Sequence, residues 1–421
     1  MTDKKILIIA FKFPPYPEVG GYRWAKFSRC FADNGYKVHV ITVKWKNRKN
    51  QSWNKDIIHD NILIYQIPSL YFHNLKYHKF SKNIFGWFLN KLRNQVLKLS
   101  YIFYFVDEAQ YWGKKMIPHA KEIINKEKIK YVISTGGPFM SNYWASVLKT
   151  NMPGIKLIQD LRDEWNDTRK FVLKYHKVKS YEYEDYALNN CDAVVTTSIG
   201  LRELFSKKIN NKNVKQYLIY NGYDEGSIKK IQFKNQIKRK RDFSFIYAGS
   251  LNNERDQVLD IFLNVVNINI RKFNNITIFI YTSDCKGIDI KYAGLVKNKN
   301  LIINNSIPQE ELFKFIDESF VALHFMPVSQ KYIVSIKLFE YGILKRPILS
   351  INAGGDSEYL IKKHNLGYSV KYDNETGILG TIIKLYKIWQ NDPFYRIEPI
   401  GLDKYSYKNL SKEYLNIINS L

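Results

Sequence analysis

The sequence predicts an α/β protein made of two domains, each built around a parallel sheet. Short apolar runs typical of buried strands alternate with amphipathic stretches along the whole chain, which is the pattern of parallel-sheet folds. The chain has 421 residues and 45% hydrophobic content, enough for two hydrophobic cores of ordinary size. A polar, basic stretch at residues 229–241 has the composition of a linker.

The first half begins with a strand, helix and strand. Residues 6–10 predict a buried strand, residues 22–34 a helix, and residues 38–42 the second strand. Gly20 and Gly21 lie in the first turn, where a backbone without side chains can approach a ligand at the carboxyl edge of the sheet. Further strands are predicted at residues 131–134, 156–160 and 193–197, and helices at residues 107–126, 181–190 and 201–207.

The second half repeats this alternation. Strands are predicted at residues 242–248, 276–281, 301–303, 321–325 and 348–351. Gly249 lies in the turn after the first of these strands, helices are expected to begin near Pro308 and Ser335, and a closing helix is expected at residues 404–421. No internal repeat is evident, although both halves follow the same plan.

The stretch from Ser335 to Pro347 joins a helix start to the buried strand that follows it. Ser335 is expected to cap the helix, which leaves its first backbone N–H groups available to a phosphate. Glu340 follows one turn further in, and a carboxylate there can accept hydrogen bonds from two sugar hydroxyls. For an isolated glutamate, the alternative is an exposed helix residue without a ligand.

The string S-x-K-x-F-E-Y followed by P, from Ser335 to Pro347, resembles a segment of the GT4-like glycosyltransferases, which are retaining enzymes of the two-domain GT-B fold. The resemblance implies that Glu340 holds the ribose of a nucleotide sugar and that the helix start faces the donor diphosphate. The residues of that helix start are Ser335, Ile336, Lys337 and Leu338. The family usually has a second Glu eight residues earlier, where this chain has Tyr332.

Three further strings resemble the same family, in the same order along the chain. The opening F-P-P…G-G-x-R string implies that Gly20 and Gly21 face the interdomain cleft, with Arg23 a weaker candidate. The Y-x-G-x-L…R string implies that Gly249 lets the backbone approach the donor and that Arg255 binds its diphosphate. Residues 217–224 are similar to the segment that closes the first domain. Relatives often have a Lys at the position of Asp260.

The loop after the strand at residues 156–160 carries D-x-R-D-x-W, similar to a branch that acts in surface-polysaccharide assembly. Many relatives have a functional His in this loop. In this chain the polar groups are Asp160, Arg162 and Asp163, which are our candidate catalytic residues on the acceptor side, together with Arg255 and Lys337 on the donor side. The alternative for the two carboxylates is a structural role in ion pairs.

The resemblance also implies a domain plan. Residues 1–225 form an acceptor-side Rossmann-like domain, residues 226–395 form a donor-binding Rossmann-like domain, and residues 396–421 return toward the first domain as a helix. The expected fold class is therefore α/β with GT-B architecture, the two parallel-sheet domains facing a deep cleft.

Composition restricts partners and location. The formal net charge of +26 requires an acidic surface or ligand, with nucleic acid, anionic lipid and phosphorylated substrate as alternatives. Residues 61–106 contain six basic residues and no Asp or Glu, interleaved with aromatic residues. This mixture suits the inner face of an anionic membrane, unless the aromatic residues are core. Three separated cysteines fit a reducing cytoplasm, and no run approaches the ~20 apolar residues of a membrane span.

Absent motifs exclude several enzyme classes. The sequence has no P-loop, G-x-G-x-x-G, H-E-x-x-H or G-x-S-x-G string. It also has no D-x-D string, and the spacing of its histidines does not suggest a metal site. We therefore expect no metal or cofactor, so that Arg255, Lys337 and the helix start at Ser335 would have to stabilise the departing diphosphate. His324 is expected to be a strand residue near the cleft.

The predicted function is a retaining, metal-independent glycosyltransferase. It would move a hexose-type residue from a nucleoside-diphosphate sugar to a lipid-linked glycan. The reaction would belong to cell-surface polysaccharide biosynthesis and take place at the cytoplasmic face of the plasma membrane. One alternative is a GT-B nucleotide-sugar epimerase, which would need no lipid surface. Another is a basic glycan- or nucleic-acid-binding protein without turnover, which the departures at Tyr332 and Asp260 would suit.

Overall fold

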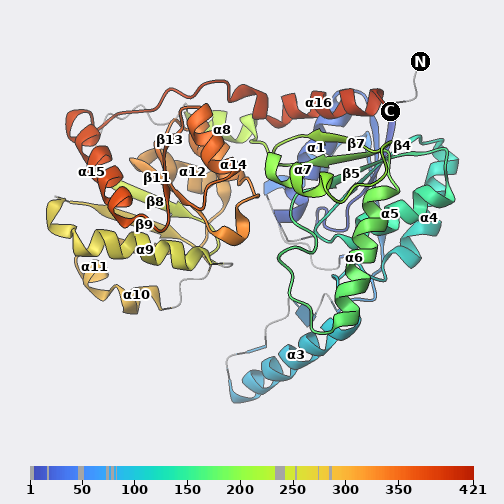
Figure 1. The fold of residues 1–421 in the computed structure, drawn as a ribbon, viewed down its shortest axis with the longest axis horizontal. Coiled ribbons are helices and arrows are strands. Elements are labelled where there is room, and N and C mark those ends of the chain that lie inside the picture. Colours follow the sequence, from blue (N-terminus) through green and yellow to red (C-terminus); the bar gives the residue numbers. More distant parts are fainter. Residues whose placement is uncertain are drawn as a thin grey trace. The chain divides into compact units, whose positions relative to one another are not determined.

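A computed structural model describes residues 4–16, 19–45, 52–72, 75–76, 80–81, 83–232, 242–251, 254–273, 275–283 and 287–421. The chain divides into two compact units (Figure 1). The first unit comprises Met1–Ile219 and Ser411–Leu421, and the second comprises Tyr220–Leu410. The domain limits predicted from the sequence place this division slightly later, after residue 225.

The first unit is built on a seven-stranded sheet in the order β3-β2-β1-β4-β5-β6-β7, and every pairing in it is parallel. Its strands are β1 (Lys5–Ile9), β2 (Lys37–Val43), β3 (Ile62–Ile67), β4 (Tyr131–Thr135), β5 (Lys156–Leu161), β6 (Ala193–Thr196) and β7 (Lys215–Leu218). Its helices are α1 (Tyr22–Asp33), α3 (Ile84–Phe103), α4 (Gly113–Glu127), α5 (Met140–Asn151), α6 (Lys174–Asn189) and α7 (Ile199–Ser206).

Burial explains why β1 forms the middle of this sheet. Its residues Ile6, Leu7, Ile8 and Ile9 are all completely buried. Successive side chains of a strand point to opposite faces, so both faces of the sheet are covered here, as in other parallel sheets. The end of the chain joins the same core, because Tyr414 of α16 (Tyr407–Asn419) packs its ring 5.4 Å from that of Trp24 on α1.

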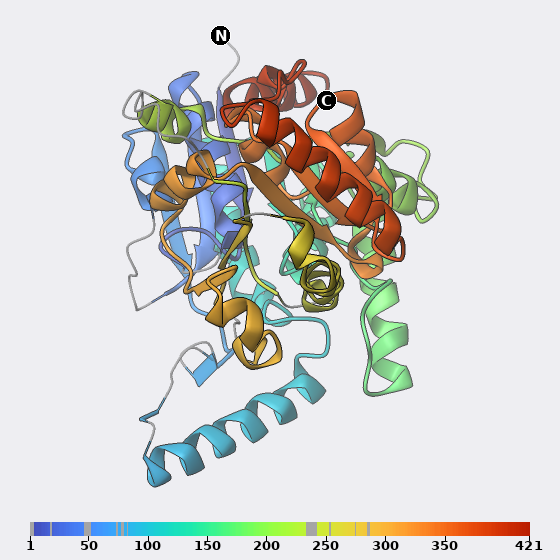
Figure 2. The same cartoon turned by 90° about the vertical axis from the view of Figure 1, so that its left-hand side faces the viewer.

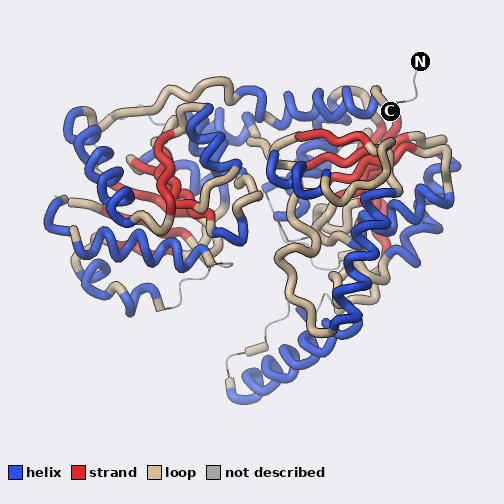
Figure 3. The backbone as a smooth tube through the Cα atoms, in the orientation of Figure 1, coloured by secondary structure: helices blue, strands red, loops and turns tan. Residues whose placement is uncertain are grey.

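The second unit is built on a six-stranded sheet in the order β10-β9-β8-β11-β12-β13, again wholly parallel. Figure 3 shows the strands of both sheets in red with helices around them. Its strands are β8 (Ser244–Ala248), β9 (Thr277–Tyr281), β10 (Leu301–Asn304), β11 (Val321–Met326), β12 (Ile348–Asn352) and β13 (Gly367–Lys371). Its helices are α8 (Glu225–Gln232), α9 (Arg255–Ile268), α10 (Ile288–Lys291), α11 (Ala293–Lys297), α12 (Gln309–Glu318), α13 (Ile336–Ile343), α14 (Asp356–Lys363), α15 (Glu375–Asn391) and the first turn of α16.

The second sheet has a hydrophobic core on each face. Phe245 and Tyr247 of β8 belong to the core that includes α9 and α15. Their neighbours Ile246 and Ala248 belong to the other core, with α12, α13 and α14. This alternation along one strand is what helices packed on both faces require.

The expected alternation of strands and helices is confirmed in both units, so the α/β class with two parallel sheets is correct. Some elements differ. The helix expected from residue 107 begins at Gly113, and α6 begins at Lys174 rather than at residue 181. The elements that were not expected are β3, β7, β13, α3, α5, α8, α10, α11 and α15. Tyr77, Lys79, Lys82, Cys285 and residues 233–241 of the expected linker lie outside the described residues.

No helix within the described ranges combines the length and apolar character that crossing a bilayer requires.

Gly367 provides a test of the second sheet. A Cβ at this position would lie 2.3 Å from the carbonyl oxygen of Ile348 on the adjacent strand, and its φ of +139° disfavours other residues. Gly367→Ala should therefore destabilise the protein by on the order of 2 kcal/mol, through overpacking and backbone strain. The matched control is Gly380→Ala in α15, where the added Cβ meets nothing within 4 Å. The control should stabilise by about 0.5–1 kcal/mol. Equal melting temperatures of the two variants would contradict the β12–β13 pairing.

Candidate functional site

The carboxyl ends of the strands in the second unit carry most of the predicted donor residues. Gly249 directly follows β8, His324 lies near the end of β11, and Ser335 precedes α13. In open parallel sheets, ligands bind at this edge because the loops there connect to helix N-termini. A nucleotide site is therefore expected at the carboxyl edge of the second sheet.

Helix α13 begins as the sequence predicts. Ser335 is its N-cap, and its Oγ accepts a hydrogen bond from the backbone N–H of Lys337 at 3.3 Å. The remaining N–H groups of the first turn give the helix start a partial positive charge. A phosphate at this end would meet both backbone donors and the side chain of Lys337.

Glu340 and Lys337 lie one turn apart on α13. Glu340 is buried, and burial raises the pKa of its carboxyl group, while the charge of Lys337 acts in the opposite direction. Burial lowers the pKa of the Lys337 ammonium, the Glu340 carboxylate opposes this, and the Arg255 guanidinium adds to it. Each charge is thus costly where it lies, and an anion beside Lys337 and Arg255 would favour their charged forms.

Gln309, the first residue of α12, donates a hydrogen bond from its side-chain amide to Glu340 Oε1. This hydrogen bond fixes the orientation of the carboxylate through one of its two oxygens. A carboxylate held in this way can accept hydrogen bonds from a ligand without first losing its orientation.

His324 is close enough to Arg255 and Lys337 for their charges to affect its pKa. Its Nδ1 lies 2.9 Å from Ser350 Oγ on the adjacent strand. Burial, together with the charges of Arg255 and Lys337, lowers the pKa of His324 from 6.5 to about 3. His324 is therefore a neutral imidazole at physiological pH and cannot contribute positive charge to an anion site.

Gly249 leaves room for the Lys337 side chain. A Cβ on Gly249 would lie 3.3 Å from Lys337 Cε and 3.3 Å from the hydroxyl oxygen of Tyr247. Any larger residue would crowd both groups. The requirement for glycine here therefore includes the packing of Lys337, in addition to the backbone approach that the sequence predicted.

The structure thus brings together Gly249, Arg255, Lys337 and Glu340, with the helix start at Ser335, Ile336 and Leu338 beside them. Gly20 and Gly21 belong to the first unit, in the turn before α1, and their part in donor binding stays a prediction. Asn252 and Asn253 of the predicted motif lie outside the described residues.

The two departures from the family pattern have different surroundings. Asp260 forms an ion pair with Lys291 at 2.7 Å and accepts a hydrogen bond from the Tyr292 hydroxyl at 3.1 Å. It therefore links α9 to α10 and the residue after it. Tyr332 is half-buried, and the Lys331 ammonium lies 4.8 Å from its ring centre.

In the first unit, Asp160 is completely buried and forms an ion pair with Arg23 at 3.1 Å. The same Arg23 nitrogen donates a hydrogen bond to the carbonyl oxygen of Ile219 at 3.0 Å. Arg23 is only 1% exposed, so neither charge reaches solvent. These contacts favour the structural alternative for Asp160, and its catalytic role stays a prediction.

Arg162 joins two loops at the carboxyl edge of the first sheet. Its guanidinium donates hydrogen bonds to the carbonyl oxygens of Gly20 and Gly136, both at 2.9 Å. Asp163 beside it is exposed. Arg162 therefore positions the Gly20 loop, while Asp163 is the carboxylate of this string that an acceptor can reach.

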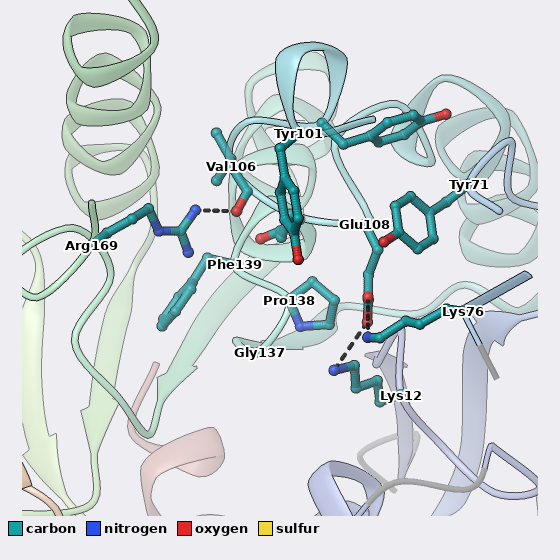
Figure 4. A pocket seen from close by; sticks show the side chains of 12 residues that line it. Lys12, Tyr71, Lys76, Tyr101, Val106, Glu108, Gly137, Pro138, Phe139 and Arg169 are labelled. Carbon is teal, nitrogen blue, oxygen red and sulfur yellow. Dashed lines mark hydrogen bonds and ion pairs between the residues drawn. The ribbon is translucent and has the colours of Figure 1, made fainter. Parts of the chain in front are cut away.

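A pocket of about 260 Å³ lies in the first unit near the end of α3 (Figure 4). Glu108 forms ion pairs there with Lys12 at 3.0 Å and with Lys76 at 2.9 Å. Burial raises the pKa of Asp107, although Arg169 opposes this. The remaining lining residues are mostly aromatic or small: Tyr71, Tyr101, Tyr104, Val106, Gly137, Pro138 and Phe139. The pocket offers both cations and ring faces, which suits a sugar or a phosphate.

Sequence reasoning missed Gln309 and this pocket. Gln309 could have been found, because it begins the helix after β10, at the same strand edge as the other donor residues. The pocket had no local signal, because its charged residues Lys12, Lys76, Glu108 and Arg169 come from four separate segments. Within the described part of the chain, no cluster of His, Cys, Asp or Glu is arranged to hold a metal ion.

No family model matches this chain, and no curated protein matches it in sequence. Solved structures match its fold over nearly its whole length. A sucrose-phosphate synthase from Thermosynechococcus elongatus is 12% identical, with a TM-score of 0.63 over 99% of this chain and 98% of that one. A glycosyltransferase from Rickettsia africae is 13% identical, with a TM-score of 0.62 over 100% and 99%. Anabaena HepE, solved with UDP and glucose, is 11% identical, with a TM-score of 0.59 over 99% of each chain.

At these identities the likeness establishes the fold. Together with the two parallel sheets, it confirms the predicted GT-B architecture of two Rossmann-like domains. The cleft expected between the domains stays a prediction.

The burial of His324 predicts a specific pH dependence. Its pKa is lower in the folded protein than in the unfolded chain, so the unfolded chain binds the proton first and stability falls as the pH falls below 6.5. By about pH 5 the loss should reach about 2 kcal/mol. In His324→Asn, which does not titrate, this part of the loss should be absent when urea unfolding is measured at about pH 7 and pH 5. The same pH dependence in both proteins would contradict the buried neutral imidazole.

Because Asp160 is paired with the buried Arg23, replacing Asp160 should lower the stability of the folded protein and not only its catalytic activity. Asp160→Asn leaves Arg23 buried without its counter-ion, which should cost about 3–5 kcal/mol and lower the melting temperature. The double variant Arg23→Met/Asp160→Leu should recover much of this loss, because it removes both charges. Asp60→Asn, at an exposed carboxylate, is the control and should leave the melting temperature unchanged. A stable Asp160→Asn protein without activity would instead favour a catalytic role.

Proposed function

We propose that this protein is a glycosyltransferase whose donor is a nucleoside-diphosphate sugar bound at the second unit. The observation that carries the proposal is the cluster of Arg255, Lys337 and Glu340 around the start of α13. Two cations and a helix N-terminus suit a diphosphate, while a buried carboxylate one turn away suits a ribose diol. The glycosyltransferases among the solved structures of this fold, and the UDP in the Anabaena structure, support the same reading.

The charges of the site explain how the donor would be held. Arg255 offers a planar set of N–H donors to the phosphate oxygens, and Lys337 adds a second cation. Because burial lowers the pKa of Lys337, the bound diphosphate would itself favour the charged ammonium. Glu340, oriented by Gln309, would accept hydrogen bonds from the ribose hydroxyls.

In the proposed reaction, the bond between the anomeric carbon and the diphosphate oxygen breaks, and a bond from that carbon to an acceptor hydroxyl forms. The acceptor proton passes to the departing diphosphate, so the step balances without a metal or a covalent enzyme intermediate. Arg255, Lys337 and the α13 amides stabilise the charge that develops on the leaving group. Retention of configuration is part of the proposal, and its basis is the resemblance of the sequence motifs.

The acceptor would bind to the first unit. Its pocket combines aromatic faces with Lys12, Lys76 and Arg169, and such a set can bind a glycan or the phosphate of a lipid-linked glycan. Asp163 and Arg162 remain candidates for contacts with the acceptor hydroxyl. We infer a cytoplasmic enzyme of cell-surface polysaccharide biosynthesis, at the inner face of the plasma membrane, for which nucleic acid is not a partner.

Nucleotide binding tests the donor site. At about 100 times its dissociation constant, the correct nucleotide among UDP, GDP, CMP and dTDP should add about 2.7 kcal/mol to the free energy of unfolding. Arg255→Gln and Glu340→Gln should each weaken binding at least about 10-fold, because each loses a charge-assisted hydrogen bond. The measurement is thermal unfolding across a titration of each nucleotide and its sugar conjugates.

The matched controls are Arg271→Gln and Glu311→Gln, which alter exposed residues of the same unit outside the cluster. They should bind like the wild type. No stabilisation of the folded wild type by any nucleotide would overturn the donor site.

A turnover assay with the nucleotide sugar that binds separates the alternative functions. Transfer to a glycan supports a glycosyltransferase, interconversion of the free nucleotide sugar supports an epimerase, and binding without turnover supports a binding protein.

A further inference from the structure

Helix α3 leaves one long side in solvent. Of its residues from Ile84 to Phe103, only Gly86 and Ser100 are buried, and Leu89, Asn90, Arg93, Val96 and Leu97 on the same side are half-buried. Figures 1 and 2 show the helix extending away from the sheet of the first unit. A helix of a globular domain normally buries its apolar face against its own core. α3 carries a further apolar face that it does not bury.

That apolar face is continuous along the helix. Ile84, Phe88, Leu92, Leu99 and Phe103 follow one another at intervals of four or seven residues, which places them on one side. Their exposure ranges from 47% at Leu92 to 90% at Ile84. Exposed apolar patches of this extent mark interaction surfaces.

One flank of the same helix is basic. Lys91 and Lys98 lie along one edge of the apolar face, Arg93 lies half-buried on the side of Gly86 and Ser100, and no Asp or Glu occurs between Asn61 and Val106. A second copy of this chain would bring like charges together, and a soluble polyanion would leave the apolar face uncovered. An anionic lipid bilayer suits both the apolar face and the basic residues, because acyl chains cover the apolar face while the anionic headgroups contact the cations.

We propose that α3 docks this protein on an anionic lipid bilayer, lying along the surface rather than crossing it. Its 20 residues give a length of about 30 Å, but three basic side chains lie along it. Docking itself does not depend on the proposed glycosyltransferase activity. Where that activity holds, the inference names the source of the acceptor, which is a molecule anchored in the same bilayer.

The end of α3 is held by residues outside the helix. The carbonyl oxygen of Phe103 accepts hydrogen bonds from the side chains of Gln110 and Tyr111, both at 2.9 Å. The start of the helix is capped by Asn83, whose Oδ1 accepts a hydrogen bond from the backbone N–H of Gly86 at 2.8 Å.

The start of α6 extends the same surface. The rings of Phe105, just after α3, and His176 in the first turn of α6 are stacked with centres 4.4 Å apart. Beside them, Val172 and Tyr175 are 73% and 62% exposed. Lys174 and Lys177 add positive charge there. The docking surface therefore comprises α3 and residues 172–177.

The pocket of the first unit opens at the end of this surface. Tyr101 of α3 and Tyr104, directly after it, are among its lining residues. A bilayer that covers α3 would therefore hold its headgroups near Lys12, Lys76 and Arg169. A lipid-anchored acceptor could then place its polar end in the pocket while its chain stays in the bilayer.

Vesicle flotation tests the docking. The full chain should float with phosphatidylcholine vesicles that contain about 30 mol% phosphatidylglycerol, and far less with phosphatidylcholine alone. Lys91→Gln/Lys98→Gln should weaken binding about 30-fold, since each basic residue contributes about fivefold. Phe88→Ser/Leu92→Ser should weaken it at least about 10-fold.

The controls are Lys297→Gln/Lys387→Gln and Ile268→Ser/Ile290→Ser, which alter equally exposed residues of the second unit. They should bind vesicles like the wild type. The α3 variants should retain the wild-type melting temperature and nucleotide response, which separates loss of docking from loss of the donor site. No binding to anionic vesicles, or unchanged binding of the α3 variants, would overturn the proposal. So would a dimer in solution that Phe88→Ser/Leu92→Ser converts to a monomer.

Trp87 reports the depth of docking. All eight tryptophans lie in the described ranges, and among them only Trp87 is a strongly exposed residue, at 61%. Its fluorescence should be quenched by bromine-labelled acyl chains in anionic vesicles, and Trp87→Phe should abolish most of that quenching. Trp87 lies at the lysine edge of the apolar face, beside Lys91, so binding that leaves its fluorescence unchanged in every respect would show that another surface meets the bilayer.

Discussion

The burial of Glu340, with the half-buried Lys337 one turn away on α13, is the constraint on which the candidate site depends. Burial disfavours the charge on each group, yet each charge supports the other, and Arg255 adds a second cation nearby. Such a cluster is costly to stability without a ligand, and an anion bound beside Lys337 and Arg255 would offset that cost. The folding of the second unit serves that arrangement: Ser335 fixes the helix start, Gly249 leaves space for Lys337, and Gln309 orients Glu340.

The first unit also contains buried charges, but they are paired with one another. Its buried Arg23–Asp160 pair satisfies both charges internally and holds the carbonyl oxygen of Ile219. The cations of its pocket share Glu108 and border solvent-facing rings, so they can exchange partners with a ligand. Beyond the pocket, α3 presents apolar and basic surface that the protein itself does not cover. These differences underlie the proposal of different ligands for the two units, a soluble nucleotide and a membrane-borne acceptor.

Much of the fold could be predicted because buried parallel strands are continuous apolar runs, as at Ile6–Ala10 and Ile348–Ile351. The strand-edge rule and the family resemblance also gave Gly249, Arg255, Lys337 and Glu340, which the structure brings together. α3 escaped prediction because its aromatic and basic residues fit a core or a surface equally well. An ion pair was the open alternative for Asp160, but its partner Arg23 could not be named, and the contact of Gln309 was missed, because both depend on residues distant in sequence.

The most direct test of the central claim combines a change in the ligand with a change in the protein. Calorimetry would compare the stabilising nucleoside diphosphate with its 2′,3′-dideoxy form, on the wild type and on Glu340→Gln. If Glu340 holds the ribose, the wild type should lose about 10-fold or more in affinity for the dideoxy form, and Glu340→Gln should show little difference between the two ligands. An equal loss in both proteins would contradict the account, because the ribose would then be held elsewhere.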